Sequence, residues 1–257
     1  MIRVGVVGAT GRMGREVCRA VDADPELELV AAVSRPHAGE RVADVLDLES
    51  DVVFTDTLDP LLEAGVEVSV DFTSAVFAPE HVAWGIEHGV HVVVGTSGFE
   101  ADPAWGEQDR VGVVIAPNFA IGAVLMMRFA EQAARHLPSA EVIELHHEDK
   151  PDAPSGTAMA TARRIAGARG GARTEAGPER VPGARGADVD GVRVHSVRLS
   201  SVVAHQEVLL GGVGETLTIR HDSTDRRSFM PGVLLAIKTV GSRPGLTMGL
   251  EPILWPG

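Results

Sequence analysis

The chain is 257 residues long, enough for two modest domains with a sizeable core, and its 44% hydrophobic residues and mean hydropathy of +0.10 predict a globular protein. A net charge of −13 disfavours nucleic acids and anionic membranes as partners, because both would repel the chain. The chain has no tyrosine and one cysteine, which excludes a Tyr–Lys acid pair, internal disulfides and a cysteine-based zinc site, and we predict no metal centre.

The first predicted element is a strand at residues 2–7. It begins directly after Met1, without a charged leader and cleavage site. No apolar run approaches the roughly 18 residues that a membrane-spanning helix needs. The sequence therefore predicts a cytoplasmic protein with no membrane partner.

A glycine-rich turn follows this strand and precedes a predicted helix that extends to Ala20. Gly8 permits the tight turn, Gly11 lets the backbone approach a pyrophosphate, and Gly14 lets the helix pack on the strand, as in a dinucleotide-binding loop. An ordinary turn is the alternative, since a glycine triplet alone is a weak signal. The expected cofactor contacts in this loop are Gly8, Ala9, Thr10, Gly11, Arg12 and Met13.

The end of the second predicted strand, at residues 27–33, bears on the choice of cofactor. NAD-selective folds usually place Asp or Glu there to bind the ribose 2′-hydroxyl, whereas this chain has Ser34 and Arg35. Without that carboxylate a 2′-phosphate is not repelled, and Arg35 can donate two hydrogen bonds to it. We predict that NADPH is preferred and that NADH is also accepted. The alternative for Arg35 is a solvated surface charge.

Further buried strands are predicted at residues 66–71, 91–94 and 111–116, with a helix at 79–88. The stretch from His37 to Asp59 is mixed and acidic, and no chemistry is assigned to it. Strands that alternate with helices predict a parallel sheet, and ligands of such sheets bind beyond the carboxyl ends of the strands. Mostly small residues follow these ends and leave room for a nicotinamide and its ribose. They are Phe72, Thr73, Gly95, Thr96 and Ser97.

A helix predicted at residues 121–136 precedes the most polar motif of the chain, EVIELHHEDKPDAPSGTA at 141–158. An apolar strand leads to His146, His147 and Lys150, and Ser155 is the expected N-cap of a helix that begins at Gly156. Backbone N–H groups at a helix start bind anions, and the imidazole and ammonium groups add positive charge. The motif predicts a pocket for one or two carboxylates. The alternative is an exposed connection from strand to helix.

This motif resembles the signature of the dihydrodipicolinate reductases, also called 4-hydroxy-tetrahydrodipicolinate reductases, of the lysine pathway. The residues that match are Glu141, Glu144, His146, Lys150, Asp152 and the run from Pro154 to Ala158. The resemblance implies an NAD(P)H-dependent oxidoreductase of lysine and diaminopimelate biosynthesis. Its substrate would be a cyclic imine-type acid with two carboxylates. It also implies a homotetramer in which the sheets of the second domains pack together.

The same resemblance implies roles for the residues of the motif. His146 would donate a proton, and Lys150 would polarise the ring nitrogen of the substrate. One carboxylate of the substrate would be bound by His147, Gly156 and Thr157. The second carboxylate needs another cation, for which the resemblance gives Arg226, although Arg220 and Arg227 have equal chemistry. Further cofactor contacts would be Ala116, Pro117, Asn118 and Phe119.

The two histidines pose a geometric condition. Adjacent side chains in a strand point to opposite faces, so His146 and His147 can share a pocket only if the strand ends there. Asp149 introduces a negative charge into the motif. It is expected either to raise the proton affinity of His146 or to face solvent.

The rest of the chain completes a second domain and returns to the first. A helix is predicted at residues 157–168, and a connection rich in Gly, Pro and Arg at 169–191 is expected to be a lid or a subunit contact. Three strands, a helix and a last strand that returns to the first domain are predicted after it, at 192–200, 202–210, 215–222, 229–240 and 245–254.

These elements predict an α/β protein with two domains. An N-terminal Rossmann dinucleotide-binding domain would comprise residues 1–119 and 229–257. A substrate-binding and oligomerisation domain, α+β and built on an open mixed sheet, would comprise residues 120–228.

Two other functions are considered. One is another two-domain NADP-dependent dehydrogenase, acting on an amino acid or a sugar. The other is a non-catalytic regulator that senses NADP. The combination of His146, Lys150 and the helix start at Ser155 disfavours both. Sugar dehydrogenases of this plan also carry Glu-Lys-Pro where this chain has the sequence from Gly95 to Ser97.

Overall fold

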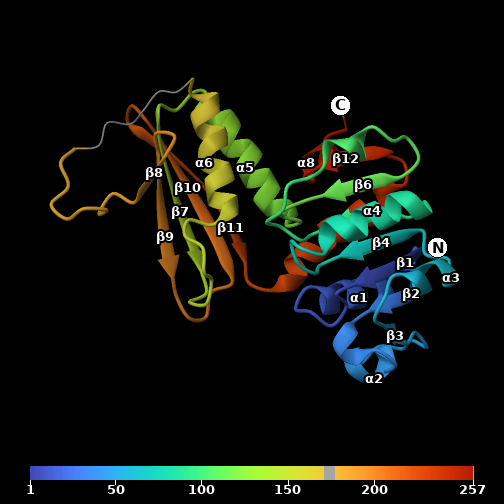
Figure 1. Cartoon of the computed structure of the whole chain (residues 1–257). Coiled ribbons are helices and arrows are strands. Elements are labelled where there is room, and N and C mark those ends of the chain that lie inside the picture. The colour runs from blue at the N-terminus through green and yellow to red at the C-terminus, as the bar shows by residue number, and fades with distance from the viewer. Residues whose placement is uncertain (171–176, 257) are drawn as a thin grey trace. The chain divides into compact units, whose positions relative to one another are not determined.

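The computed structural model describes residues 1–170 and 177–256, and the chain divides into two compact units (Figure 1). Unit 1 comprises Met1–Phe119 and Phe229–Gly257, and unit 2 comprises Ala120–Ser228. Each unit is built on a sheet of its own. No helix in the described part of the chain has the length and apolar character needed to cross a bilayer.

Unit 1 contains a seven-stranded sheet in the order β12-β6-β5-β4-β1-β2-β3. All pairings between these strands are parallel, so the carboxyl ends lie at one edge. The chain order reverses at β1, which lies between β4 and β2, and such a switch point is where dinucleotide folds bind their ligand. The strands are β1 (Ile2–Val7), β2 (Leu27–Val33), β3 (Phe54–Thr55), β4 (Val68–Asp71), β5 (His91–Val94), β6 (Gly112–Ile115) and β12 (Gly245–Met248).

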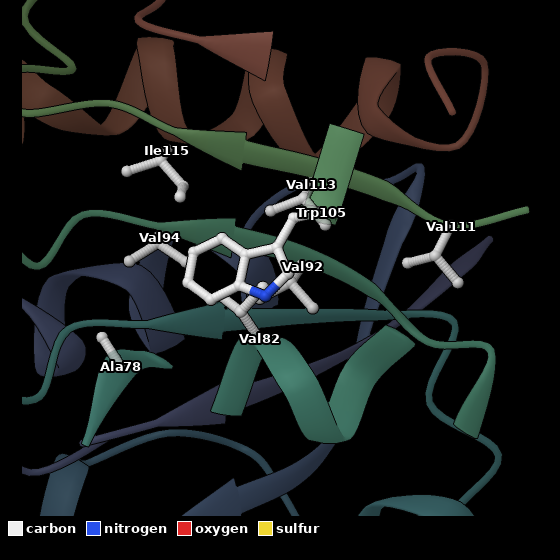
Figure 2. Packing of buried hydrophobic residues seen from close by; sticks show 8 residues of the cluster. All are labelled: Ala78, Val82, Val92, Val94, Trp105, Val111, Val113 and Ile115. Atoms are coloured by element: carbon white, nitrogen blue, oxygen red, sulfur yellow. The ribbon is translucent and has the colours of Figure 1, made fainter. Parts of the chain in front are cut away.

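Helices cover both faces of this sheet. Val92 and Val94 on β5 pack with Trp105 and with Val82 of α4 in one apolar cluster (Figure 2). Val93 points to the opposite face and is also fully buried, so that face is covered too. The helices of unit 1 are α1 (Gly14–Asp22), α2 (Val42–Leu46), α3 (Asp59–Glu63), α4 (Ala78–His88), α7 (Met230–Val240) and α8 (Glu251–Leu254), with short 3-10 helices η1 (Arg35–His37) and η2 (Pro103–Gly106).

Unit 2 contains a five-stranded sheet in the order β11-β10-β7-β9-β8. The pairing of β7 with β9 is parallel and the other pairings are antiparallel, so the sheet is mixed, as predicted. Helices α5 (Ile121–Ala134) and α6 (Gly156–Ala168) lie side by side on one face (Figure 1). The strands are β7 (Ser139–His146), β8 (Ala187–Val189), β9 (Val192–Arg198), β10 (Ala204–Gly212) and β11 (Glu215–Ser223), and η3 (Arg226–Phe229) follows β11.

The Rossmann sheet and the second mixed sheet confirm the predicted fold class, but two local predictions need correction and one stretch without predicted elements contains several. The unassigned stretch from His37 to Asp59 contains α2, β3 and the start of α3. The last strand ends at Met248, because Gly249 has a φ of +77° and α8 begins two residues later. The connection at 169–191 contains β8, while residues 171–176 of this predicted lid or subunit contact lie outside the described residues.

Candidate active site

In unit 1, the residues expected to contact a cofactor follow the carboxyl ends of five parallel strands. Gly8 follows β1, Ser34 follows β2, Phe72 follows β4, Gly95 follows β5 and Ala116 follows β6. Because the strands are parallel, these positions lie at one edge of the sheet.

A cavity of about 320 Å³ lies at this edge. Its lining includes six of the residues expected to contact the cofactor, Gly8, Thr10, Gly11, Ser34, Arg35 and Phe72, together with Thr73. Asp56 and Phe77 also line it, and neither was expected from the sequence. The cavity is therefore formed by the loops after β1, β2, β3 and β4.

The glycines of the first loop have the geometry that a dinucleotide needs. Gly8 has a φ of +78°, and a Cβ there would lie 2.7 Å from the carbonyl oxygen of Phe72. A Cβ on Gly14 would lie 2.1 Å from the carbonyl oxygen of Gly8. Side chains at either position would push the loop or the start of α1 out of place, so these residues fit a bound dinucleotide.

The other loop positions contribute in different ways. The N–H of Ala9 donates to the carbonyl of Val33 at 3.0 Å, which ties the loop to β2. Arg12 is exposed and Met13 half-buried just before α1.

The end of β2 carries one cation, and a carboxylate lies beside it at the same cavity. The hydroxyls of Ser34 and Thr10 are 2.6 Å apart. The guanidinium of Arg35, an exposed residue, lies 5.4 Å from the ring centroid of Phe77. Asp56 is exposed at the same cavity. An arginine and an aspartate thus both reach the region where the adenosine ribose of a dinucleotide would lie.

Below this edge lies a fully buried pair, Asp71 and His81. The Nδ1 of His81 is 3.0 Å from Asp71 Oδ2, and its Nε2 is 3.0 Å from the Ser69 hydroxyl. Thr96 Oγ1 donates to Asp71 Oδ1 at 2.6 Å, and the N–H of Thr73 donates to the same oxygen at 3.0 Å. Burial alone would raise the pKa of Asp71, but the hydrogen bonds from His81, Thr96 and Thr73 lower it below its usual value.

The residues that follow β5 and β6 are tightly packed. A Cβ on Gly95 would lie 2.0 Å from the Phe72 ring, and the Phe72 and Phe119 ring centroids are 6.0 Å apart. Ala116 and Phe119 are buried. The remaining expected contacts are more open, with Ser97 and Pro117 exposed and Asn118 half-buried.

In unit 2, β7 ends at His146, and a turn follows it. The N–H of Lys150 donates to the carbonyl of His147 at 3.2 Å and closes this turn. The condition for placing His146 and His147 together is therefore met, because His147 lies outside the strand. Both histidines and Lys150 are partly exposed.

The carboxylate beside His146 is Glu144. His146 Nδ1 donates to Glu144 Oε2 at 2.5 Å, and the Glu144 side chain is fully buried while that of His146 is 15% exposed. Residues two apart in a strand lie on the same face, which explains the pairing. Asp149 is exposed, so it faces solvent, which is one of the two expectations for this residue.

Arg198 connects these groups to Lys150. Its Nη1 and Nη2 donate to the two oxygens of Glu144 at 2.9 and 3.0 Å, and Nη2 also donates to the carbonyl of Asp152 at 2.6 Å. The Asp152 carboxylate in turn accepts from Lys150 Nζ at 2.7 Å. One network thus joins the two residues expected to be catalytic, although they have no direct contact in it.

Burial alone would raise the pKa of Glu144. Hydrogen bonds from His146, Arg198 and Ser196 outweigh burial and lower the pKa to about 2. The carboxylate is therefore charged at neutral pH.

The start of α6 confirms the predicted N-cap. Ser155 Oγ accepts from the N–H of Ala158 at 3.2 Å, and the N–H of Ser155 donates to Glu144 Oε1 at 3.2 Å. Gly156, the first residue of the helix, is exposed, and Thr157 is half-buried. The helix start and His146 are thus tied to the same carboxylate.

Arg226 lies in η3 and is half-buried. Of the alternatives, Arg220 pairs with Glu207 and Asp222, and Arg227 pairs with Asp225. Within the described residues, Arg226 is the member of this group without a hydrogen-bonded carboxylate. This leaves its guanidinium more available to an anionic ligand than the other two.

Sequence reasoning gave no role to four residues that shape these sites. Glu144 could have been found from its spacing to His146 on a strand, whereas Arg198, Asp56 and His81 carry no local signal. In the described residues, no group of His, Cys, Asp and Glu side chains has a metal-binding arrangement.

The chain matches family models over nearly its whole length. Residues 2–119 match the model described as dihydrodipicolinate reductase, N-terminus, and residues 122–254 match the C-terminus of the same family. A protein of Nocardia farcinica named 4-hydroxy-tetrahydrodipicolinate reductase is 54% identical, with 98% of each chain covered. A protein of the same name from Cutibacterium acnes is 50% identical, with 99% of each chain covered.

Solved structures agree with these matches. A dipicolinate-bound dihydrodipicolinate reductase from Paenisporosarcina sp. TG-14 has a TM-score of 0.87 and 39% identity, with 98% of this chain and 99% of that chain covered. A myo-inositol dehydrogenase from Corynebacterium glutamicum shares the fold, with a TM-score of 0.63 at 15% identity over 99% of this chain and 92% of that one.

Proposed function

We propose, from the premise that the chain belongs to the dihydrodipicolinate reductase family, that it is a 4-hydroxy-tetrahydrodipicolinate reductase of lysine and diaminopimelate biosynthesis. It is an NAD(P)H-dependent oxidoreductase that acts on a small dicarboxylate. The observation that carries the proposal is the network in unit 2 that joins His146, Glu144, Arg198, Asp152 and Lys150 beside the start of α6.

Unit 1 is the dinucleotide-binding domain. The cavity after β1, β2, β3 and β4 takes the adenosine and pyrophosphate part, and the residues after β5 and β6 take the nicotinamide part. When bound, the cofactor supplies hydride. The tight packing at Gly8, Gly14 and Gly95 supports this assignment, because a side chain at any of them would obstruct the loops.

NADPH is the preferred cofactor and NADH is also accepted. Arg35 can pair with a 2′-phosphate, and no carboxylate occupies the end of β2. Asp56 offers an acceptor to a free 2′-hydroxyl, which supports the use of NADH. A clear preference for NADH in kcat/KM would contradict the role given to Arg35.

Unit 2 is the substrate-binding and oligomerisation domain. One carboxylate of the substrate binds at the start of α6, where backbone N–H groups and the helix dipole favour an anion, with His147, Gly156 and Thr157 as ligands. Arg226 binds the second carboxylate. Its lack of a carboxylate partner among the described residues supports this choice over Arg220 and Arg227.

His146 and Lys150 carry the chemistry. Hydride delivery to an electron-poor ring leaves negative charge that must be met by a proton or a fixed cation. The Nδ1–H of His146 is held by Glu144, so Nε2 is the atom from which the imidazolium can donate a proton. The ammonium of Lys150, with a side chain that is 22% exposed, polarises the ring nitrogen.

The enzyme is a cytoplasmic homotetramer assembled through the open sheets of unit 2. Among the described strands, β11 and β8 form the edges of this sheet, and Leu217 on β11 is exposed. Light scattering should give about four times the 27.0 kDa mass of the chain. A monomer at the concentrations of the activity assay would contradict this assembly.

A coupled assay tests the function directly. The unstable substrate is made in place by condensation of pyruvate with aspartate semialdehyde, and NADPH oxidation is followed by absorbance. Turnover that depends on the condensation step supports the proposal. NADPH binding without turnover would favour a non-catalytic regulator, and turnover of sugars or amino acids would favour another dehydrogenase.

A further inference from the structure

We infer that Glu144, held by Arg198, is a positioning residue that fixes the imidazole of His146 and the start of α6 in one arrangement. This inference rests on the proposed function, because it assigns the chemical step to His146. It concerns two residues to which the proposed function gives neither a catalytic nor a ligand-binding role.

A buried carboxylate is costly, and three residues donate four hydrogen bonds to this one. Glu144 is fully buried, accepts from both Nη atoms of Arg198 at 2.9 and 3.0 Å, and also accepts from His146 and from the N–H of Ser155. Replacing a buried ion pair by apolar residues is often neutral or stabilising. Stability alone therefore gives no reason to place a carboxylate here.

The sheet sets the positions of the three side chains. Glu144 and His146 are two residues apart on β7 and share a face. Arg198 lies on the parallel neighbour β9, in register with His146, while Ser196 is in register with Glu144. The fork of the guanidinium can thus reach both carboxylate oxygens, which fixes the carboxylate in one orientation.

This arrangement determines which nitrogen of His146 is available. Glu144 accepts the Nδ1 proton, and no described residue forms a hydrogen bond with Nε2. The hydrogen bond at one ring nitrogen sets the tautomer and leaves the other nitrogen for proton exchange. Because Ser155 N–H donates to the second oxygen, the same carboxylate ties the anion-binding helix start to the imidazole.

Arg198 extends the arrangement to the second cation. Its Nη2 also donates to the carbonyl of Asp152, whose carboxylate holds Lys150. The Glu144–Arg198 pair therefore orients the imidazole, the helix start and, through Asp152, the ammonium. None of these contacts requires either residue to touch the substrate.

The chain contains a matched control on the same strand. Glu141 lies on the opposite face of β7 and also pairs with a histidine and an arginine, His195 at 2.8 Å and Arg185. The side chain of Glu141 is 30% exposed, and its partners do not include the start of α6. The two glutamates thus have the same kinds of partner, but one of them alone is connected to His146.

The test compares Glu144→Gln with Glu141→Gln. An amide at 144 has no charge to stabilise the imidazolium that donates from Nε2. It can also donate to Nδ1 and enforce the opposite neutral tautomer, so kcat should fall by about 100-fold or more while the Kd for NADPH is unchanged. Glu141→Gln should stay within about 3-fold of the parent in kcat. In ¹⁵N spectra of histidine-labelled protein, the proton of neutral His146 should move from Nδ1 to Nε2 in Glu144→Gln and should stay on Nδ1 in Glu141→Gln.

A double variant guards against a folding defect. Glu144→Gln with Arg198→Met removes both charges together, so it should fold even if Glu144→Gln does not, and its kcat should still be low. Parental kcat and an unchanged tautomer in either folded variant would overturn the inference. If the parent itself fails to turn over the dicarboxylate, the proposed function fails, while the tautomer measurement still decides the role of Glu144.

Discussion

Each unit contains a carboxylate–imidazole pair at the end of a central strand, and the two pairs differ in one decisive respect. In unit 1, Asp71 and His81 are fully buried, and both ring nitrogens of His81 contact protein groups. In unit 2, Glu144 is equally buried, but His146 is 15% exposed and uses only Nδ1. The first pair has no nitrogen left for a ligand, whereas the second has one.

The difference teaches how the same chemical pair can serve two purposes. Asp71 accepts hydrogen bonds from Thr73 and Thr96, so it stabilises the loops after β4 and β5, where the cofactor is proposed to bind. Glu144 stabilises the start of α6 in a similar way, but it also holds the imidazole of His146, which is partly exposed to solvent. The free ring nitrogen, more than the pair itself, marks the candidate for chemistry.

The largest expected effect is on stability in unit 1. His81→Ala leaves the Asp71 carboxylate buried without its imidazole, which should lower the free energy of unfolding by about 3 kcal/mol or more in urea titrations. The folded fraction should keep kcat within about 3-fold of the parent, because His81 is fully buried and both of its ring nitrogens contact protein groups. A 100-fold loss of kcat without destabilisation would show that Asp71 and His81 take part in catalysis, and the proposed difference between the two pairs would then be wrong.

The next effect is on turnover in unit 2. Lys150→Ala should lower kcat by about 100-fold, which corresponds to about 2.7 kcal/mol, with little change in stability because its pair with exposed Asp152 is weak. The chain has one other lysine, Lys238, which pairs with Asp24 and Glu26 and serves as the matched control. Equal rates for Lys150→Ala and Lys238→Ala would remove Lys150 from the mechanism.

Acid titration should separate Glu144 from an ordinary surface carboxylate. Its pKa is lowered from 4.5 to about 2, so its contribution to stability is complete above pH 4.5 and is lost as the pH falls toward 2. Between pH 5 and pH 3, the parent should lose about 2 kcal/mol more than Glu144→Gln in chemical unfolding. Parallel losses in the two proteins would show that Glu144 is not held as described.

The smallest effect concerns the cofactor edge, which binds without performing the proton chemistry. Arg35→Ala should lower kcat/KM for NADPH by about 10-fold and leave that for NADH nearly unchanged, since it removes one charge-assisted contact. Asp56→Asn should act in the opposite sense, with NADH affected more than NADPH. If both cofactors respond equally to Arg35→Ala, the arginine does not distinguish the 2′-phosphate.

Much of the fold and part of the candidate site could be predicted from the sequence, because these features leave local signals in the chain. Long apolar strands and the glycine loop predict the Rossmann unit, and the Ser155 N-cap signal predicts the start of α6. Short elements such as α2 and β3 were missed because they are too short to show a period. Arg198 and Asp56 were missed because strand register and loop approach bring them to their sites, and neither leaves a local signal in the chain.

The most direct measurement of the central claim is the rate of NADPH oxidation by His146→Gln relative to the parent, with freshly condensed substrate and saturating cofactor. Because Glu144 keeps Arg198 and Ser155 as partners in this variant, its unfolding should match the parent. The account predicts a rate at least about 100-fold lower in a stably folded protein. A rate within a few-fold of the parent would show that His146 does not supply the proton.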